Sequence, residues 1–197
     1  MGADNSPVDA VAAPPLKPIA IPARLADTPA QGPKYAVSVN NAGGETVTVA
    51  DPNATRAAVA LMNIHAVTGG AACHWGGPAA FAEIMAATHA IMFATEGRQW
   101  HEAFNFVNDA GHTENGVYAL RANYNFDGQD YTALRGFRGI HSKLTGHGES
   151  HLNPEGVLIS NGPLGSGLPQ AQGLAIGDQL AGNDRVTVCI ISDGAMM

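Results

Sequence analysis

The sequence contains few cysteines, few basic residues and no long apolar stretch. Two cysteines among 197 residues are too few for a disulfide-stabilised scaffold. Ten basic residues against seventeen acidic ones give a formal net charge of −7, which disfavours a broad electrostatic interaction with nucleic acid or an anionic membrane. No apolar run approaches the roughly 20 residues that a bilayer-spanning helix requires. We therefore expect a globular protein with no nucleic acid or membrane partner.

The first 33 residues lack aromatic side chains and hold seven of the twelve prolines. Proline breaks helices, and a segment with so little apolar bulk cannot offset its ordering entropy by burial. We expect an extended N-terminal arm here. It has no secretory signal pattern, so the expected location is cytoplasmic. Residues 35–39 and 46–49 alternate around a glycine-containing turn and predict a small hairpin. Residues 1–50 are thus interpreted as arm and hairpin, and residues 51–197 as a separate domain.

The second part of the chain combines helical patterns with one strongly apolar strand pattern. Residues 185–191 are apolar and rich in β-branched side chains, which is typical of a strand buried on both faces of a parallel sheet. Together with the helices, this strand predicts an α/β fold in which a parallel sheet is flanked by helices. The predicted helices cover residues 51–67, 81–93, 117–123, 130–137 and 168–180.

Two features near the end of the chain predict a site for a metal-bound diphosphate. Asp193 follows the predicted strand, and ligands of parallel α/β sheets bind beyond the carboxyl ends of strands. A single carboxylate there is a suitable Mg²⁺ ligand. Upstream, the glycine-rich run of residues 162–167 leads into a helix and can present backbone N–H groups to an anion. The plainer alternative for each feature alone is a tight turn and a helix-capping aspartate.

Other site types match the sequence less well. Gly165 and Gly167 begin a dinucleotide fingerprint, but Gln170 stands where its third glycine is needed. Residues 147–149 match the His-x-Glu of zinc deaminases, yet the paired cysteines of those enzymes are missing. A metal cluster of residues 147, 149 and 151 stays open as an alternative.

All eight histidines lie between His65 and His151. His74, His112 and His147 occur in glycine-lined loops, where a histidine is less often core filler than on an apolar helix face. These three are therefore the candidates for chemistry. His65 and His89 fall on apolar helical faces and are interpreted as structural.

Five segments, in this order, resemble the thiamine-diphosphate domain of the transketolase family over roughly residues 55–197. They are His74-Trp75-Gly76-Gly77-Pro78, then Asp109-Ala110-Gly111-His112 with Val117–Leu120, then Phe137-Arg138 with His141–Lys143 and Thr145–Glu149, then Asn161–Gly167, and finally Ser192-Asp193-Gly194. The resemblance implies an enzyme that depends on thiamine diphosphate and Mg²⁺ and transfers a two-carbon ketol unit between sugar phosphates.

The resemblance also implies a role for each matching position. Asp193 is expected to bind the Mg²⁺ that bridges the cofactor's diphosphate. The expected cofactor-lining residues are Gly162, Pro163, Leu164, Gly165 and Gly194. The expected catalytic residues are His74, His112 and His147, placed around the reactive thiazolium carbon and the substrate oxygens.

Two alternative functions accompany this expectation. Gly116-Val117-Tyr118-Ala119 after Gly111-His112 is also similar to the pyruvate dehydrogenase E1 component, a 2-oxo acid decarboxylating subunit. Ser192 and Gly148 stand where the transketolase pattern has glycine and proline, and these departures suggest a non-catalytic binding subunit.

The family pattern extends past the end of this chain. It continues with an asparagine that binds Mg²⁺ and with a second domain, whose glutamate acts across a dimer interface. We therefore expect a domain truncated at its C-terminus and inactive alone. Its partner would be the rest of the enzyme, as a C-terminal segment or second subunit, and the full assembly would be a homodimer.

Overall fold

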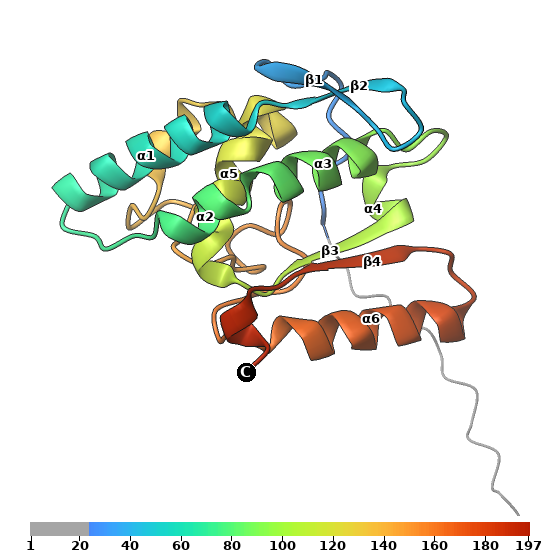
Figure 1. The fold of residues 1–197 in the computed structure, drawn as a ribbon. Helices are drawn as coiled ribbons and strands as arrows, with labels where there is room; N and C mark the ends of the chain where they lie inside the picture. The colour runs from blue at the N-terminus through green and yellow to red at the C-terminus, as the bar shows by residue number, and fades with distance from the viewer. Residues whose placement is uncertain (1–23) are drawn as a thin grey trace, which may run out of the picture.

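The computed structural model describes residues 24–197, so most of the predicted N-terminal arm lies outside the described residues. Helices and strands are mixed along the chain (Figure 1). In chain order, the strands and α-helices are β1 (Ala36–Asn40), β2 (Thr46–Ala50), α1 (Pro52–Thr68), α2 (Gly76–Ala80), α3 (Ala82–Phe93), α4 (Trp100–Ala103), β3 (Phe104–Asn108), α5 (Glu114–Asn123), α6 (Gly167–Ala181) and β4 (Val186–Ile190). The 3₁₀ turns are η1 (Gly111–Thr113), η2 (Phe126–Gly128), η3 (Ala133–Gly136) and η4 (Asp193–Ala195).

The central sheet is formed by β3 and β4, which pair in parallel from Phe104 opposite Val186 to Asn108 opposite Ile190. Helix α6 covers one face of this sheet, and α3 and α5 lie on the other side (Figure 1). The predicted class, an α/β fold with a parallel sheet flanked by helices, is confirmed. Because the strands are parallel, the segments that follow β3 and β4 leave the sheet at the same edge.

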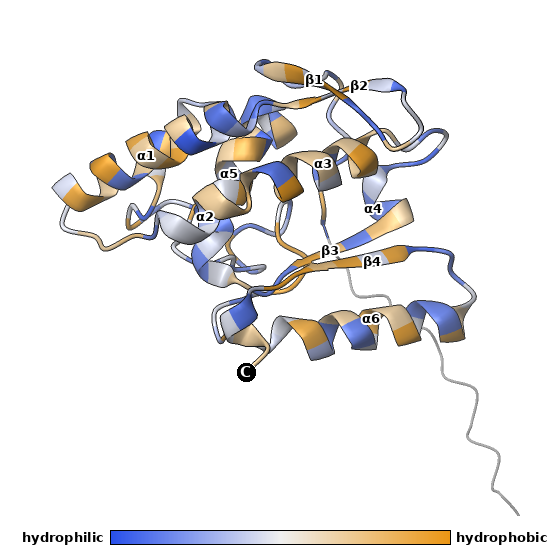
Figure 2. Cartoon of the chain, in the orientation of Figure 1, coloured by the Kyte–Doolittle hydropathy of each residue, from blue (hydrophilic) through white to orange (hydrophobic). Residues whose placement is uncertain are grey.

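Two clusters of buried apolar side chains hold the helices against the sheet. In the first, Phe106 and Ile190 of the sheet pack with Val117 and Leu120 of α5 and with residues of α3. In the second, α1 packs against α5 and against the buried side chains of Leu134, Phe137 and Leu144. In Figure 2, β4 is coloured largely as apolar, whereas β3 combines apolar and hydrophilic residues.

The strand over β4 is confirmed, but its predicted burial on both faces is wrong. Ile190 is buried, whereas Val186 is 55% exposed. Helices lie on both sides of the sheet, but β4 pairs only with β3 among residues 24–197, so its other edge is open and its side chains between Val186 and Ile190 are only partly buried. The sequence does not predict β3, because Asn105 and Asn108 interrupt its apolar pattern.

Most of the predicted helices are present, and the first residues of α1 show how a capping side chain and a proline mark a helix start. Asp51 caps α1 by accepting a hydrogen bond from the Asn53 amide at 2.8 Å, and Pro52 occupies the first turn. The predicted helix of residues 81–93 is confirmed as α3, with α2 as a separate short helix before Phe81. The helices near residues 117–123 and 168–180 are confirmed as α5 and α6.

The predicted helix of residues 130–137 is wrong. The Asp130 carboxylate accepts hydrogen bonds from the amides of Thr132 and Ala133, as a helix N-cap does, but no α-helix follows it. Only the short turn η3 follows, and it delivers Leu134 and Phe137 to the cluster beneath α1.

The predicted hairpin is present, since β1 and β2 pair antiparallel with Asn40 opposite Thr46. It is tied to α5 through Asn123, whose side chain exchanges two hydrogen bonds with the Tyr35 backbone, at 2.7 and 2.8 Å. None of the helices within residues 24–197 combines the length and the apolarity needed to cross a membrane.

Candidate functional site

Three histidines from separate loops lie together beyond the carboxyl end of β3. The rings of His74 and His112 meet edge to face with centroids 5.2 Å apart. Burial lowers the pKa of His112, and the neighbouring His74 and His147 lower it further. Burial also lowers the pKa of His147, followed by the effects of Arg138 and His74. The structure thus brings all three predicted catalytic histidines into one group, and the neutral form is favoured for His112 and His147.

Two asparagines hold the loop that carries His74. The His74 carbonyl accepts hydrogen bonds from Nδ2 of Asn63, at 2.7 Å, and from Nδ2 of Asn115, at 2.9 Å. These amides come from α1 and α5, and the Asn115 amide also donates to Oδ1 of Asn63 at 3.1 Å. The position of His74 is therefore set by two helices of the core.

Gly111 allows the His112 and His147 segments to approach each other. A Cβ atom at Gly111 would lie 2.5 Å from Oδ1 of Asn161, 2.8 Å from the His147 ring and 2.9 Å from the Gly162 nitrogen. Any side chain larger than hydrogen would separate these segments. Gly111 is thus the point where the second histidine segment, the third one and the glycine-rich loop meet.

The glycine-rich loop is held by Asp109, a residue to which the sequence analysis gave no separate role. Asp109 is fully buried directly after β3. Its carboxylate accepts hydrogen bonds from the amides of Gly165, at 3.1 Å, and Gly167, at 2.5 Å. In the sequence, Asp109 could have been recognised only by its place two residues before Gly111, directly after a strand that the sequence did not predict. Because these amides are already bonded to Asp109, neither is free in this structure to bind an anion.

The remaining predicted cofactor-lining residues lie at the surface of this loop. Gly162 and Gly165 have φ angles of +146° and +82°, which favour glycine. Pro163 and Leu164 are exposed, with Leu164 at 53%. They are therefore accessible to a ligand over the loop.

The turn after β4 lies against the glycine-rich loop. A Cβ at Gly165 would lie 2.9 Å from the Ala195 carbonyl oxygen, so η4 and the loop are in contact. Asp193 and Gly194 are exposed on this turn, and the Gly194 amide donates to Oδ1 of Asp193 at 2.9 Å. The predicted metal ligand and the predicted cofactor loop therefore adjoin at the same edge of the sheet.

The donor chemistry fits a diphosphate with Mg²⁺ better than a metal held by protein alone. Within residues 24–197, no three histidine, cysteine or acidic side chains converge as a metal site, so the alternative cluster of residues 147, 149 and 151 is not formed. Asp193 contributes one exposed carboxylate, and Mg²⁺ commonly takes one or two carboxylates together with phosphate oxygens.

A buried carboxylate behind the histidines was also missed by the sequence analysis. Glu114, the first residue of α5, is 3% exposed, and its Oε2 accepts hydrogen bonds from Nδ2 of Asn108 and of Asn161, at 2.7 and 3.0 Å. Burial raises the pKa of Glu114, and the two amide donors oppose that rise. No sequence signal distinguishes this glutamate from an ordinary residue of a first helical turn.

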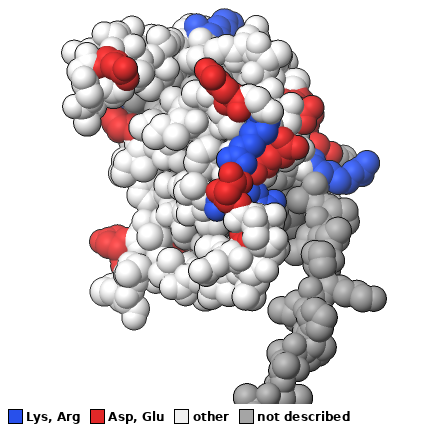
Figure 3. All heavy atoms as spheres, turned by 90° about the vertical axis from the view of Figure 1, so that its right-hand side faces the viewer, with Lys and Arg blue, Asp and Glu red and all other residues white. Residues whose placement is uncertain are grey.

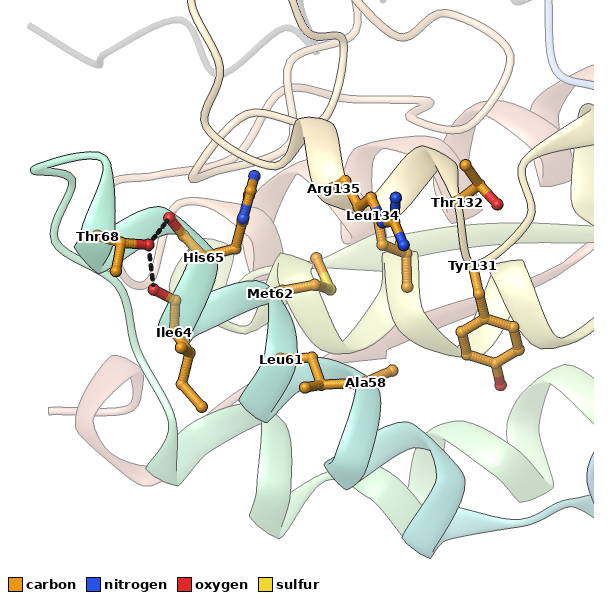
Figure 4. A pocket seen from close by; sticks show the side chains of 10 residues that line it. All are labelled: Ala58, Leu61, Met62, Ile64, His65, Thr68, Tyr131, Thr132, Leu134 and Arg135. Atoms are coloured by element: carbon orange, nitrogen blue, oxygen red, sulfur yellow. Dashed lines mark hydrogen bonds between the residues drawn. The ribbon is translucent and has the colours of Figure 1, made fainter.

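A large groove lies elsewhere on the described chain. It has a volume of about 670 Å³ and runs between α1 and residues 131–135 (Figure 4). Leu61 and Ile64 line it and are well exposed, and His65 is at one end. None of the three candidate catalytic histidines lines this groove.

Comparisons with known proteins agree on one family. The family model described as "Transketolase, thiamine diphosphate binding domain" matches residues 52–197. The chain is 29% identical over 152 residues to the transketolase of Buchnera aphidicola subsp. Schizaphis graminum, which covers 71% of this chain and 23% of that protein. It is 34% identical over 108 residues to transketolase 2 of Escherichia coli (strain K12), covering 50% of this chain and 16% of the relative.

A third relative is shorter and is named as one subunit of an apulose-4-phosphate transketolase, from Actinobacillus succinogenes. The chain is 28% identical to it over 145 residues, covering 73% of this chain and 50% of the relative. The matched region therefore spans between 16% and 50% of the length of these three relatives.

Proposed function

Because the chain belongs to the transketolase family, whose thiamine-diphosphate-binding domain it carries over residues 52–197, we propose that it is the cofactor-binding part of a transferase that moves a two-carbon ketol unit between sugar phosphates. The observation that carries this proposal is the meeting of three histidine segments, the glycine-rich loop and Asp193 at one edge of the β3–β4 sheet.

The cofactor residues of the proposal are those of the glycine-rich loop and the turn after β4. Gly162, Pro163, Leu164 and Gly165 would line thiamine diphosphate, with the Gly194 backbone beside it, and Asp193 would bind Mg²⁺. Thiamine diphosphate supplies the carbanion chemistry of such transfers when bound. The Asp193 carboxylate would hold Mg²⁺, and the positive charge of the metal ion would in turn neutralise the diphosphate.

The histidines would handle protons at the substrate oxygens. Burial lowers the pKa of His112 and of His147, which favours the neutral form of both imidazoles. A neutral imidazole has one nitrogen that donates a hydrogen bond and one that accepts a proton. His74, His112 and His147 can therefore bind a substrate hydroxyl or carbonyl and move a proton to or from it.

The proposed partner is the rest of the enzyme, as a further segment or a second subunit, in an assembly that we propose to be a homodimer. The support for a partner is that the match covers 16% to 50% of the three relatives, one of which is itself named as a subunit.

The decisive experiment measures cofactor binding and then turnover. Calorimetry with thiamine diphosphate at millimolar Mg²⁺ should detect binding by the assembly containing this chain, and Asp193→Ala should abolish it. Asp184→Ala is the matched control, since Asp184 is exposed and pairs with Arg98 at 2.6 Å on the surface. Absence of binding by the unmodified assembly would refute the proposal.

The turnover assay separates the reactions that this cofactor permits. Ketol transfer between sugar phosphates is expected. Activity only in a lipoamide-linked 2-oxo acid assay would favour the pyruvate dehydrogenase E1-like alternative. If Asp193→Ala leaves the activity of the assembly unchanged, a non-catalytic binding subunit is favoured.

A further inference from the structure

The buried carboxylate of Glu114 forms no ion pair among the described residues, and the charge of Arg121 on the same helix favours its ionised form only from a distance. Burying an unpaired carboxylate is costly, so its presence needs a compensating interaction. Both of its amide donors, Asn108 at the end of β3 and Asn161 before the glycine-rich loop, bond to the same oxygen, Oε2. The start of α5 adds favourable helix-terminal electrostatics. Glu114 thereby connects the sheet to a loop 47 residues further along the chain.

Asn161 extends this connection to the residue after His147. Its Oδ1 accepts a hydrogen bond from the Gly148 amide at 2.7 Å, and its backbone amide donates to the Gly148 carbonyl at 2.9 Å. An amide side chain that donates to Glu114 through Nδ2 must present Oδ1 to its other neighbour. Glu114 therefore determines which side-chain atom of Asn161 faces Gly148.

Glycine at position 148 suits this contact. A Cβ there would lie 2.9 Å from Nδ2 of Asn161 and 3.0 Å from Cδ of Glu114. A proline, which the transketolase pattern has at this position, would also have no N–H to donate to Asn161. Gly148 therefore differs from that pattern in a way that suits Asn161, because the Asn161 side chain accepts a hydrogen bond from the Gly148 N–H.

Asn161 also lies beside the His147 ring. A Cβ at Gly111 would touch both Oδ1 of Asn161 and Cδ2 of His147, so the two side chains meet over the same glycine. We propose that Glu114 and Asn161 are positioning residues for His147, with Glu114 orienting the Asn161 amide and Asn161 holding the His147–Gly148 segment. The inference depends on the proposed function only in treating His147 as catalytic.

The first test observes His147 directly in the ligand-free full chain. Histidine ring carbons are isotopically labelled, and the His147 signal is assigned by its loss in His147→Gln. Glu114→Ala and Asn161→Ala should shift or split this signal and move its pH midpoint upward, because the ring becomes less buried. Glu114→Gln should keep the native signal, since its amide oxygen can still accept from Asn108 and Asn161.

Asn105→Ala is the matched control. It also removes a buried amide that bonds a buried carboxylate, that of Asp178 at 2.7 Å, on the α6 side of the sheet. This variant should lower stability without moving the His147 signal. An unchanged signal in folded Asn161→Ala, or an equal change in Asn105→Ala, would overturn the inference. If Glu114→Ala does not fold, the inference is tested with Asn161→Ala alone. Asn161 is only partly buried, so its substitution is expected to leave the chain folded.

A second test uses the complete assembly. Asn161→Ala should lower kcat by about 10- to 100-fold with little change in KM for the substrate, as expected when a reacting group is displaced by about 1 Å. A change confined to KM would contradict a positioning role. The ligand-free measurement does not require cofactor binding, so its outcome is independent of whether the proposed function holds.

Discussion

At the scale of single residues, His89 is the clearest case of an ionisable group kept neutral by its surroundings. It is fully buried on α3, between the rings of Phe93 and Phe106. Its Nδ1 lies 3.0 Å from the Met85 carbonyl, and its Nε2 lies 3.4 Å from Nε of Arg121. Nδ1 therefore donates, Nε2 accepts, and a second proton has no acceptor. Burial lowers the pKa of His89 to about 3, and the Arg121 charge adds to this.

This environment predicts acid sensitivity. Above pH 6.5 His89 is neutral in both the folded and the unfolded chain, so it does not make the free energy of unfolding depend on pH there. As the pH falls from 6.5 towards 3, the unfolded chain binds a proton that the folded chain does not. The free energy of unfolding should then decrease by about 1.4 kcal/mol per pH unit from this residue. Urea denaturation across this pH range measures the slope.

His89→Gln should reduce that slope, because glutamine does not titrate. His141→Gln, which changes an exposed histidine, should leave it as in the unmodified chain. A slope retained in His89→Gln would show that other groups cause the acid sensitivity.

A second prediction at this scale concerns Gly111. Gly111→Ala would place a Cβ 2.5 Å from Asn161 and 2.9 Å from the backbone of Gly162, which must move apart. We expect a loss of about 1–3 kcal/mol in unfolding free energy. Thermal and chemical denaturation measure it, and a neutral effect would mean that the histidine loops are less tightly joined than the structure indicates.

At the scale of elements, α6 shows how a helix with few buried apolar residues is attached to the sheet. Its buried Asp178 accepts hydrogen bonds from Asn105 of β3, at 2.7 Å, and from the Arg185 side chain before β4, at 2.5 Å. Although burial raises the pKa of Asp178, the hydrogen bonds from Arg185, Asn183 and Asn105 outweigh it, and the pKa is lowered. A polar contact therefore fixes the end of α6 that lies far from the histidines.

The same helix contains Gly173, which is exposed and has open space where a Cβ would be. Gly173→Ala should stabilise the chain by about 0.5–1 kcal/mol, because alanine loses less backbone entropy in a helix. Its melting temperature should rise, in contrast to that of Gly111→Ala. A lower melting temperature would indicate that this face of α6 is packed.

At the scale of the whole molecule, the charge distribution bears on ligand binding. Acidic and basic side chains lie next to one another on the face shown in Figure 3, within a mostly uncharged surface. With a net charge of −7, the chain offers a diphosphate no general attraction. A divalent cation at Asp193 would supply the attraction that the protein charge lacks.

This predicts a strict dependence of ligand binding on the metal. Thiamine diphosphate with Mg²⁺ should raise the unfolding free energy of the assembly by about 2.7 kcal/mol at a ligand concentration roughly 100 times Kd. Thiamine diphosphate with EDTA should give no increase in melting temperature. An increase of equal size without the metal would contradict a role for Asp193 in metal binding.

Elements with local signals can be predicted from the amino-acid sequence. Asp51 and Pro52 mark the start of α1, and the apolar run before Ser192 marks β4. The order of the histidine and glycine segments indicated the family, which the match over residues 52–197 shows. These signals are readable because each depends on neighbouring residues or on a fixed spacing.

The contacts that join distant segments are visible only in the folded chain. Asp109 holds amides 56 and 58 residues away, and Glu114 bonds to Asn161 across 47 residues. β3 and the turn at residues 133–136 likewise follow from burial against other elements. Such roles leave no local pattern, because a buried carboxylate is stable only with donors that folding brings to it.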